Sequence, residues 1–232
     1  MKIFTFGDGY ATGHLWPEWP QILQALLPNY EVVNTAGIGA GPEFLVSGMI
    51  DILPQLHNQT VIFQWPYANR FDKLVEDDSW NSIIESDPVY HFNTVTDKRN
   101  QQWWLSSASQ QLIQYHKHYV QPKQQQHRLK MYKILVSGTL DSVHCKYLFT
   151  STQEQELYSR QARFGKTRQN EVQPSPWVHY CWLIDEILPI LNITPKPARQ
   201  QRLLELIQQQ TWTPYDPDRE QTWQDIQDTL NG

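Results

Sequence analysis

The stretch KIFTFGDG, residues 2–9, decides how the rest of the chain is interpreted. Its apolar residues alternate and then stop at Gly7-Asp8-Gly9. A short apolar run that ends in glycines predicts a buried β-strand followed by a sharp turn. In α/β proteins the carboxyl end of the first parallel strand faces the ligand crevice. We therefore expect the candidate site at this turn.

The next sixty residues repeat the same pattern. Apolar runs at 31–36 and 60–65 predict two further strands, and helical spacing predicts helices at 15–27 and 42–54. The third run, TVIFQW, is nearly continuous in apolar residues, which is typical of a central parallel strand. The order β-α-β-α-β predicts an α/β fold. Its mainly parallel sheet would carry helices on both faces, in a three-layer α/β/α, flavodoxin-like arrangement.

The second half of the chain is less uniform. Residues 66–104 show little regular pattern and are interpreted as an irregular insertion. Helical spacing returns over 105–136, with a break expected at Pro122, and 141–151 predicts a fourth strand. A strong helix is predicted at 175–192, with Ser175 as its cap and Pro176 at its first position.

The last forty residues differ from the rest. Four prolines interrupt 193–232, and two amphipathic helices are predicted within it. We interpret 1–192 as the α/β domain and 193–232 as a helical C-terminal appendage. The appendage would pack either on the domain or on a partner, which includes a second copy of the chain.

Composition excludes several classes of protein. The chain has 232 residues, of which 40% are hydrophobic, and a net charge of −5, so it can bury a core and lacks the basic face of nucleic-acid-binding proteins. No apolar run reaches the ~20 residues of a membrane helix, and no signal peptide pattern is visible. The two cysteines predict no disulfide framework. We expect a cytoplasmic protein without cofactor or metal, since no phosphate-loop, GxGxxG or zinc spacing occurs.

Four segments occur in an order that is typical of one family. They are GDGYATG, NTAGIGAGPEF, VIFQWPYANRFD and NEVQPSPWVHYCWL. Together they resemble the SGNH, or GDSL-type, hydrolases over about 2–192, and more closely the divergent branch found in phage and marine bacterial genomes. The resemblance implies an ester hydrolase fold. It also implies that the chain could be phage-encoded and act in the host cytoplasm or the virion.

The departures from this family concern its catalytic triad. The resemblance expects a serine nucleophile at position 9, an aspartate at 170 and a histidine base at 173, where this chain has Gly9, Asn170 and Gln173. Glycine has no side chain, and neither amide titrates near neutral pH, so this set cannot activate a nucleophile. The leading hypothesis is a catalytically degenerate domain that serves as a binding or structural module.

A rearranged site is the alternative. Asp8, His14 and His179 are the candidate residues for general base chemistry in an active esterase or acyl hydrolase. Such an enzyme would act on an acylated carbohydrate or a small ester. The competing interpretation is structural: Asp8 would hold the crevice loops together, and His179 would cap or pack within its helix.

The same crevice could bind a carbohydrate or another small molecule. Backbone amides of the turn at 37–41 could bind an anionic or carbonyl oxygen. Arg70 could pair with a carboxylate, or form an internal ion pair with Asp72 or Asp8. Trp65 could stack on a sugar ring, or pack in the core. The full set of predicted crevice residues is Asp8, Gly9, Gly39, Gly41, Gln64, Trp65, Arg70 and Gln173.

Overall fold

A computed structural model describes most of the chain. It covers residues 1–8, 11, 17–37, 40–66, 68, 72–75, 93–96, 102–105, 121–151, 175–212 and 217–232. The fold is α/β, as predicted. Its main sheet has the order β2-β1-β3-β7, and every neighbouring pair is parallel. The strands are β1 (Lys2–Phe6), β2 (Glu31–Asn34), β3 (Thr60–Trp65) and β7 (Lys146–Ser151).

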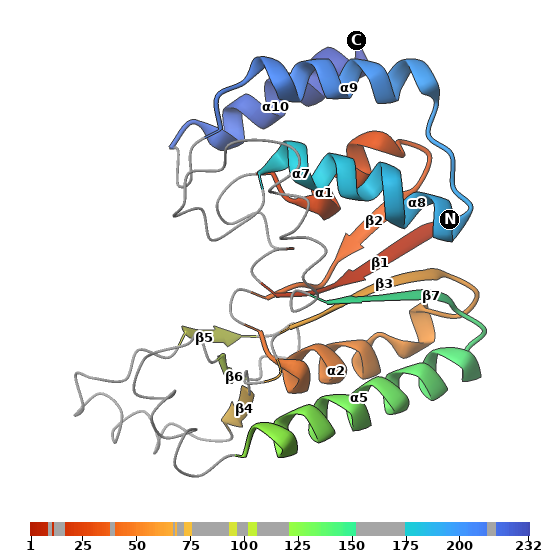
Figure 1. Ribbon diagram of the computed structural model, residues 1–232, viewed down its shortest axis with the longest axis vertical. Coiled ribbons are helices and arrows are strands. Elements are labelled where there is room, and N and C mark those ends of the chain that lie inside the picture. The colour runs from red at the N-terminus through yellow and green to blue at the C-terminus, as the bar shows by residue number, and fades with distance from the viewer. Residues whose placement is uncertain are drawn as a thin grey trace.

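The two central strands separate two apolar cores. Ile3 of β1 and Ile62 of β3 contribute to one core, whereas Phe4 and Phe63 contribute to the other. This division follows from the alternation of side chains along a strand. Helices lie on both sides of the sheet (Figure 1). We refer to the first cluster as the α1 core and to the second as the α2 core.

The α1 core is covered by helices from both ends of the chain. They are α1 (Trp19–Leu26), α7 (Pro176–Trp182), a π-helical turn (Leu183–Ile187), α8 (Leu188–Leu191), α9 (Pro197–Gln209) and α10 (Arg219–Asn231). Ser175 caps α7, since its Oγ accepts a hydrogen bond from the Val178 amide at 3.5 Å, and Pro176 is the first helical residue, as predicted. The predicted helix at 175–192 is interrupted by the π-helical turn and ends at Asn192 in the left-handed region, with φ 52°.

The C-terminal segment packs on the domain itself. Leu203 and Ile207 of α9 and Trp223 of α10 are buried in the α1 core, in the same cluster as residues of α1 and α7. The segment 193–232 thus covers the α/β domain, which is one of its two predicted arrangements (Figure 1).

The α2 core is covered by α2 (Pro42–Asp51), a short 3-10 helix (Leu53–Gln55) and α5 (Pro122–Ser142). The break predicted at Pro122 coincides with the start of α5, where proline fits because a residue at the first helical position needs no amide hydrogen. The predicted helical residues 106–120 lie outside the described residues. The predicted strand at 141–151 begins only at Lys146. Helical bonding continues to Ser142, and His144 adopts a turn conformation with φ 55°.

The predicted irregular insertion contains regular structure. Three four-residue strands, β4 (Asp72–Val75), β5 (Asn93–Thr96) and β6 (Gln102–Leu105), form an antiparallel sheet of order β4-β6-β5. The prediction of irregular structure was wrong for these segments. Strands of this length are too short for alternation of side chains to stand out in a mixed sequence.

Candidate functional site

The candidate site lies where β1 and β3 end. The chain leaves β1 for β2 on one side and returns to β3 on the other side of β1, so the direction of winding changes between β1 and β3. Ligands of open α/β sheets bind at the carboxyl end of the strands at such a switch point. Gly7 and Asp8 directly follow β1, and Gln64 and Trp65 are the last two residues of β3.

Gly7 is required by close packing at this edge. A Cβ atom on Gly7 would lie 2.8 Å from Ala11 Cβ and 3.0 Å from Gln64 Oε1. The Gly7 carbonyl accepts a hydrogen bond from the Gly37 amide at 3.1 Å, which extends the pairing of β1 with β2 into the loops. The glycine that opens the turn therefore lets it lie close to Ala11, to the Gln64 side chain and to the Gly37 backbone.

Asp8 lies beneath the surface. Its side chain has no exposed area, and its carbonyl accepts a hydrogen bond from the Ala11 amide at 2.9 Å, which closes the turn. The neighbouring strand supports the same turn, because Asn34 Nδ2 donates to the Ala11 carbonyl at 2.5 Å and Asn34 Oδ1 accepts from Thr5 Oγ1 at 2.9 Å. This geometry favours the interpretation of Asp8 as part of the loop scaffold.

Gln64 and Trp65 point to opposite faces of the sheet. Gln64 Oε1 accepts a hydrogen bond from the Trp19 indole at 3.0 Å, which ties the end of β3 to the start of α1. Trp65 is fully buried in the α2 core, with its ring centroid 4.3 Å from that of Phe63 and 5.6 Å from that of Phe149. Of the two interpretations of Trp65, the structure has the core residue and not the sugar-stacking one.

The described amides of the glycine-rich turn, those of Gly37, Ala40 and Gly41, are engaged within the protein. Ala40 donates to the Gly37 carbonyl at 3.0 Å, and the Gly41 amide contacts both carboxylate oxygens of Asp72 at 2.8 Å. The Phe44 amide donates to the same carboxylate at 2.9 Å. Ala40 and Gly41 therefore use their amides within the protein, and the anion that the Gly41 amide binds is the side chain of Asp72.

Asp72 has a structural role in this region that we did not expect. It begins β4, yet it caps the N-terminus of α2, where its charge also complements the helix dipole. Sequence reasoning missed this role. The available signal was Gly41-Pro42 at the start of α2, because a helix that begins without Ser, Thr, Asp or Asn needs an acceptor from elsewhere.

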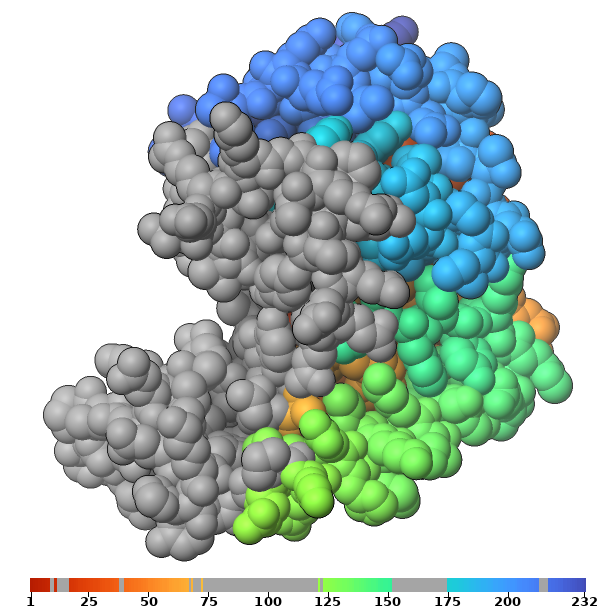
Figure 2. All heavy atoms as spheres, in the orientation of Figure 1, coloured from red at the N-terminus to blue at the C-terminus, as the bar shows by residue number. Residues whose placement is uncertain are grey.

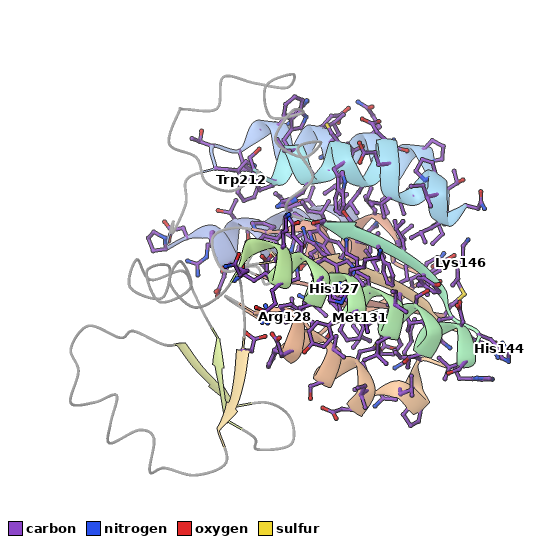
Figure 3. The ribbon with its side chains drawn as sticks, turned by 60° about the horizontal axis from the view of Figure 1, so that its bottom comes forward. His127, Arg128, Met131, His144, Lys146 and Trp212 are labelled. Atoms are coloured by element: carbon purple, nitrogen blue, oxygen red, sulfur yellow. The ribbon has the colours of Figure 1, made fainter. Side chains whose placement is uncertain are left out.

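A polar network extends from this cap to α5. Glu43 Oε2 accepts from the Asp72 amide at 3.2 Å, and Glu43 Oε1 lies 3.3 Å from both Arg128 Nη1 and Tyr132 Oη. Arg128, labelled in Figure 3, also donates to the Ala68 carbonyl at 3.3 Å. Burial, followed by the charge of Glu43, raises the pKa of the Tyr132 hydroxyl. The network joins α2 and α5 to the segment that follows β3.

His179 is enclosed within α7. Its side chain is 1% exposed, and burial lowers the pKa of the imidazole from 6.5 to about 3. Its Nδ1 has no hydrogen-bond partner among the residues that the structure describes. The imidazole is therefore neutral at pH 7 and is a weak base, which favours the interpretation of His179 as a packed helix residue.

Six predicted site residues lie outside the described residues. They are Gly9, His14, Gly39, Arg70, Asn170 and Gln173. The other predicted crevice residues, Asp8, Gly41, Gln64 and Trp65, are all buried: Asp8 follows β1, Gly41 precedes α2, and Gln64 and Trp65 end β3 on opposite faces of the sheet.

Within the described ranges, no three His, Cys, Asp or Glu side chains are placed to share a metal ion. Cys145 and Cys181 are not in a disulfide, and both are half-buried. None of the described helices combines the length and the apolar character that a membrane crossing requires.

Comparisons with protein-family models, with curated proteins and with solved structures found no match.

Proposed function

We propose that this chain is a catalytically degenerate SGNH-hydrolase-like domain of three-layer α/β/α architecture that binds a ligand at the carboxyl edge of its sheet. Two features support the architecture: the parallel order β2-β1-β3-β7 and the change of winding between β1 and β3. The family resemblance supports the location, because Gly9 follows directly on the β1 turn.

The observation that carries the non-catalytic assignment is the burial of His179. It is the only histidine near the last family segment, and with a pKa of about 3 it could not accept a proton efficiently at neutral pH. Asp8 is equally enclosed. With Gly9, Asn170 and Gln173 at the family's triad positions, hydrolysis by this route would lack its nucleophile, base and acid.

The ligand is proposed to be a carbohydrate or another small molecule rich in oxygen atoms. The amides of Ala40 and Gly41 are bound within the protein, so we assign ligand contacts to Arg70, Gly39 and Gln173 from the sequence. An arginine can hold a carboxylate or sulfate through two parallel hydrogen bonds, and an amide side chain can bond to a sugar hydroxyl.

An activity assay tests the missing triad. The wild-type chain should not hydrolyse short-chain nitrophenyl esters above the buffer rate. The triple variant Gly9→Ser, Asn170→Asp and Gln173→His should gain turnover, while the double variant without Gly9→Ser serves as the matched control. Turnover by the wild-type chain would overturn the non-catalytic assignment.

A binding assay tests the ligand class. Glycans found on an array are titrated calorimetrically into the wild-type chain and into Arg70→Ala. Arg202→Ala is the matched control, because the Arg202 side chain is 49% exposed on α9. We expect Arg70→Ala to lose at least tenfold in affinity and Arg202→Ala to keep the wild-type value. Equal affinity of all three proteins would contradict the assignment of Arg70.

A further inference from the structure

The outer face of α5 carries exposed apolar side chains. Met131, Ile134 and Leu135 are 55%, 58% and 49% exposed, although Val136 and Leu140 of the same helix are buried in the α2 core. The side chains of α5 lie at the molecular surface in Figure 2, and Figure 3 labels His127 and Met131 on neighbouring turns. Apolar residues on two sides of a helix are typical of a helix that is covered on both of those sides.

Two of these exposed residues, Met131 and Ile134, belong to a row with the spacing of a helix-pairing seam. His127, Met131, Ile134, Gly138 and Asp141 recur at intervals of four, three, four and three residues, and we call this set the α5 seam. This spacing places all five on one stripe of the helix, as in the seam of a coiled coil. The seam runs over four turns of a regular 21-residue helix that is roughly 30 Å long.

The surface beside the seam can receive side chains of another helix. An open hollow of about 480 Å³ lies between α5 and β7, with Lys133, Ser137 and Phe149 among its lining residues. Gly138 faces open space, since no heavy atom outside its neighbours and its own helical backbone lies within 4 Å of the position that its Cβ would occupy. A second backbone can therefore approach closely at this turn.

The charges on and beside the α5 seam favour a second copy of the same chain. Lys130 lies beside the seam towards one end and Asp141 lies on it at the other, and neither is ion-paired with another described residue. An antiparallel copy of α5, related by a two-fold axis at Ile134, brings position 127 opposite position 141. It also brings Lys130 opposite Gly138, one turn from Asp141. Each copy then supplies the same contacts twice, as two-fold symmetry requires.

We propose that two copies of this chain associate through antiparallel pairing of α5. Ile134 packs against its symmetry mate at the axis, Met131 fills space beside Gly138 of the second copy, and Lys130 pairs with Asp141 at each end. A single helix pair covers less than the ~800 Å² per partner of a standard interface, so the dimer should dissociate on dilution. This inference does not depend on the ligand or on the proposed function.

Sedimentation velocity from about 1 to about 200 µM tests the proposal, since this range spans the affinities of small interfaces. The wild-type chain should shift from monomer to dimer, and Ile134→Glu should weaken association at least tenfold. Ile50→Glu is the matched control, because Ile50 is 50% exposed on α2. This variant should associate as the wild-type chain does. A wild-type chain that is monomeric throughout, or an equal loss in both variants, overturns the proposal.

A charge exchange tests the antiparallel direction. Lys130→Asp alone and Asp141→Lys alone each place like charges together and should weaken the dimer, whereas the double variant should restore it to near the wild-type affinity. Failure of the double variant to recover any affinity would contradict the proposed pairing of these two residues.

Cross-linking tests the position of the axis. Under oxidising conditions Ile134→Cys should form a disulfide-linked dimer, because position 134 faces itself. Ser142→Cys should not, since antiparallel pairing separates the two copies of position 142 by about 24 Å along the helix. The wild-type chain measures the background from Cys145 and Cys181. Cross-linking of Ser142→Cys without Ile134→Cys would overturn the arrangement.

Discussion

The indole Nε1 of Trp19 donates a hydrogen bond to Oε1 of Gln64 at 3.0 Å, and both side chains are buried. This bond joins the first turn of α1 to the end of β3, at the edge of the sheet where the candidate site lies.

Trp19→Phe keeps an aromatic ring but removes the donor. Gln64 Oε1 would then be left buried without this partner, so we expect a loss of about 1–3 kcal/mol in the free energy of unfolding. Urea denaturation followed by circular dichroism measures this loss. Adding Gln64→Leu should recover part of it, because the unsatisfied acceptor is removed. Full additivity of the two changes would show that the bond carries no coupling energy.

Gly7→Ala tests the close approach at the first turn. The new Cβ would lie 2.8 Å from Ala11 Cβ and 3.0 Å from Gln64 Oε1, which Trp19 holds in place. Overpacking of this kind costs about 1–3 kcal/mol. The matched control is Gly48→Ala in α2, where no atom lies within 4 Å. It should stabilise the protein by up to about 1 kcal/mol. Equal thermal midpoints for both variants would contradict this prediction.

Asp72→Ala removes the acceptor that caps α2. The amides of Gly41 and Phe44 would lose their partner, and we expect a loss of about 1–2 kcal/mol of stability. Asp72→Asn keeps one acceptor oxygen and should lose less. Chemical denaturation of the two variants measures the difference. A larger loss for Asn than for Ala would be inconsistent with capping.

His179 should make the stability depend on pH. The unfolded imidazole binds a proton below about pH 6.5, whereas the folded one does so only near pH 3. Above pH 6.5 protonation of His179 does not reduce the free energy of unfolding. As the pH falls towards 3, the free energy of unfolding decreases, by at most about 5 kcal/mol in total. Denaturation between pH 7 and pH 4 should show this slope in the wild-type chain.

One variant identifies the group responsible. His179→Phe should flatten the pH dependence. The same slope in the wild-type chain and in His179→Phe would assign the effect to other groups.

Arg199 joins the C-terminal segment to the domain. It donates to the carbonyl of Ala25 at the end of α1 at 2.5 Å, and to the carbonyl of Leu230 and Oδ1 of Asn231 at the end of α10, both at 3.0 Å. Arg199→Ala should cost about 1.5–3 kcal/mol, as expected for bonds to a charged donor. Arg202→Ala, on the exposed side of α9, should change stability by less than about 0.5 kcal/mol.

Much of the fold could be predicted from local patterns. The run TVIFQW forms β3 at its predicted residues, and Ser175-Pro176 opens α7, because a buried strand and a capped helix each leave a short signal in the chain. The insertion was harder to predict. Its strands have four residues each, and their pairing joins β4 to β6, which are distant in the sequence.

For the candidate site, the sequence alone determined what three side chains can do. Gly9, Asn170 and Gln173, which the family resemblance would place at the triad positions, cannot form a Ser-His-Asp triad in any arrangement, since this follows from the side chains themselves. Only the tertiary structure decided what the remaining polar groups do. Asp72 caps a helix that begins thirty residues earlier, at Pro42, and Gln64 and Trp65, adjacent in sequence, lie on opposite faces of the sheet. Such roles depend on which groups meet across the fold, and a local pattern carries no information about a distant partner.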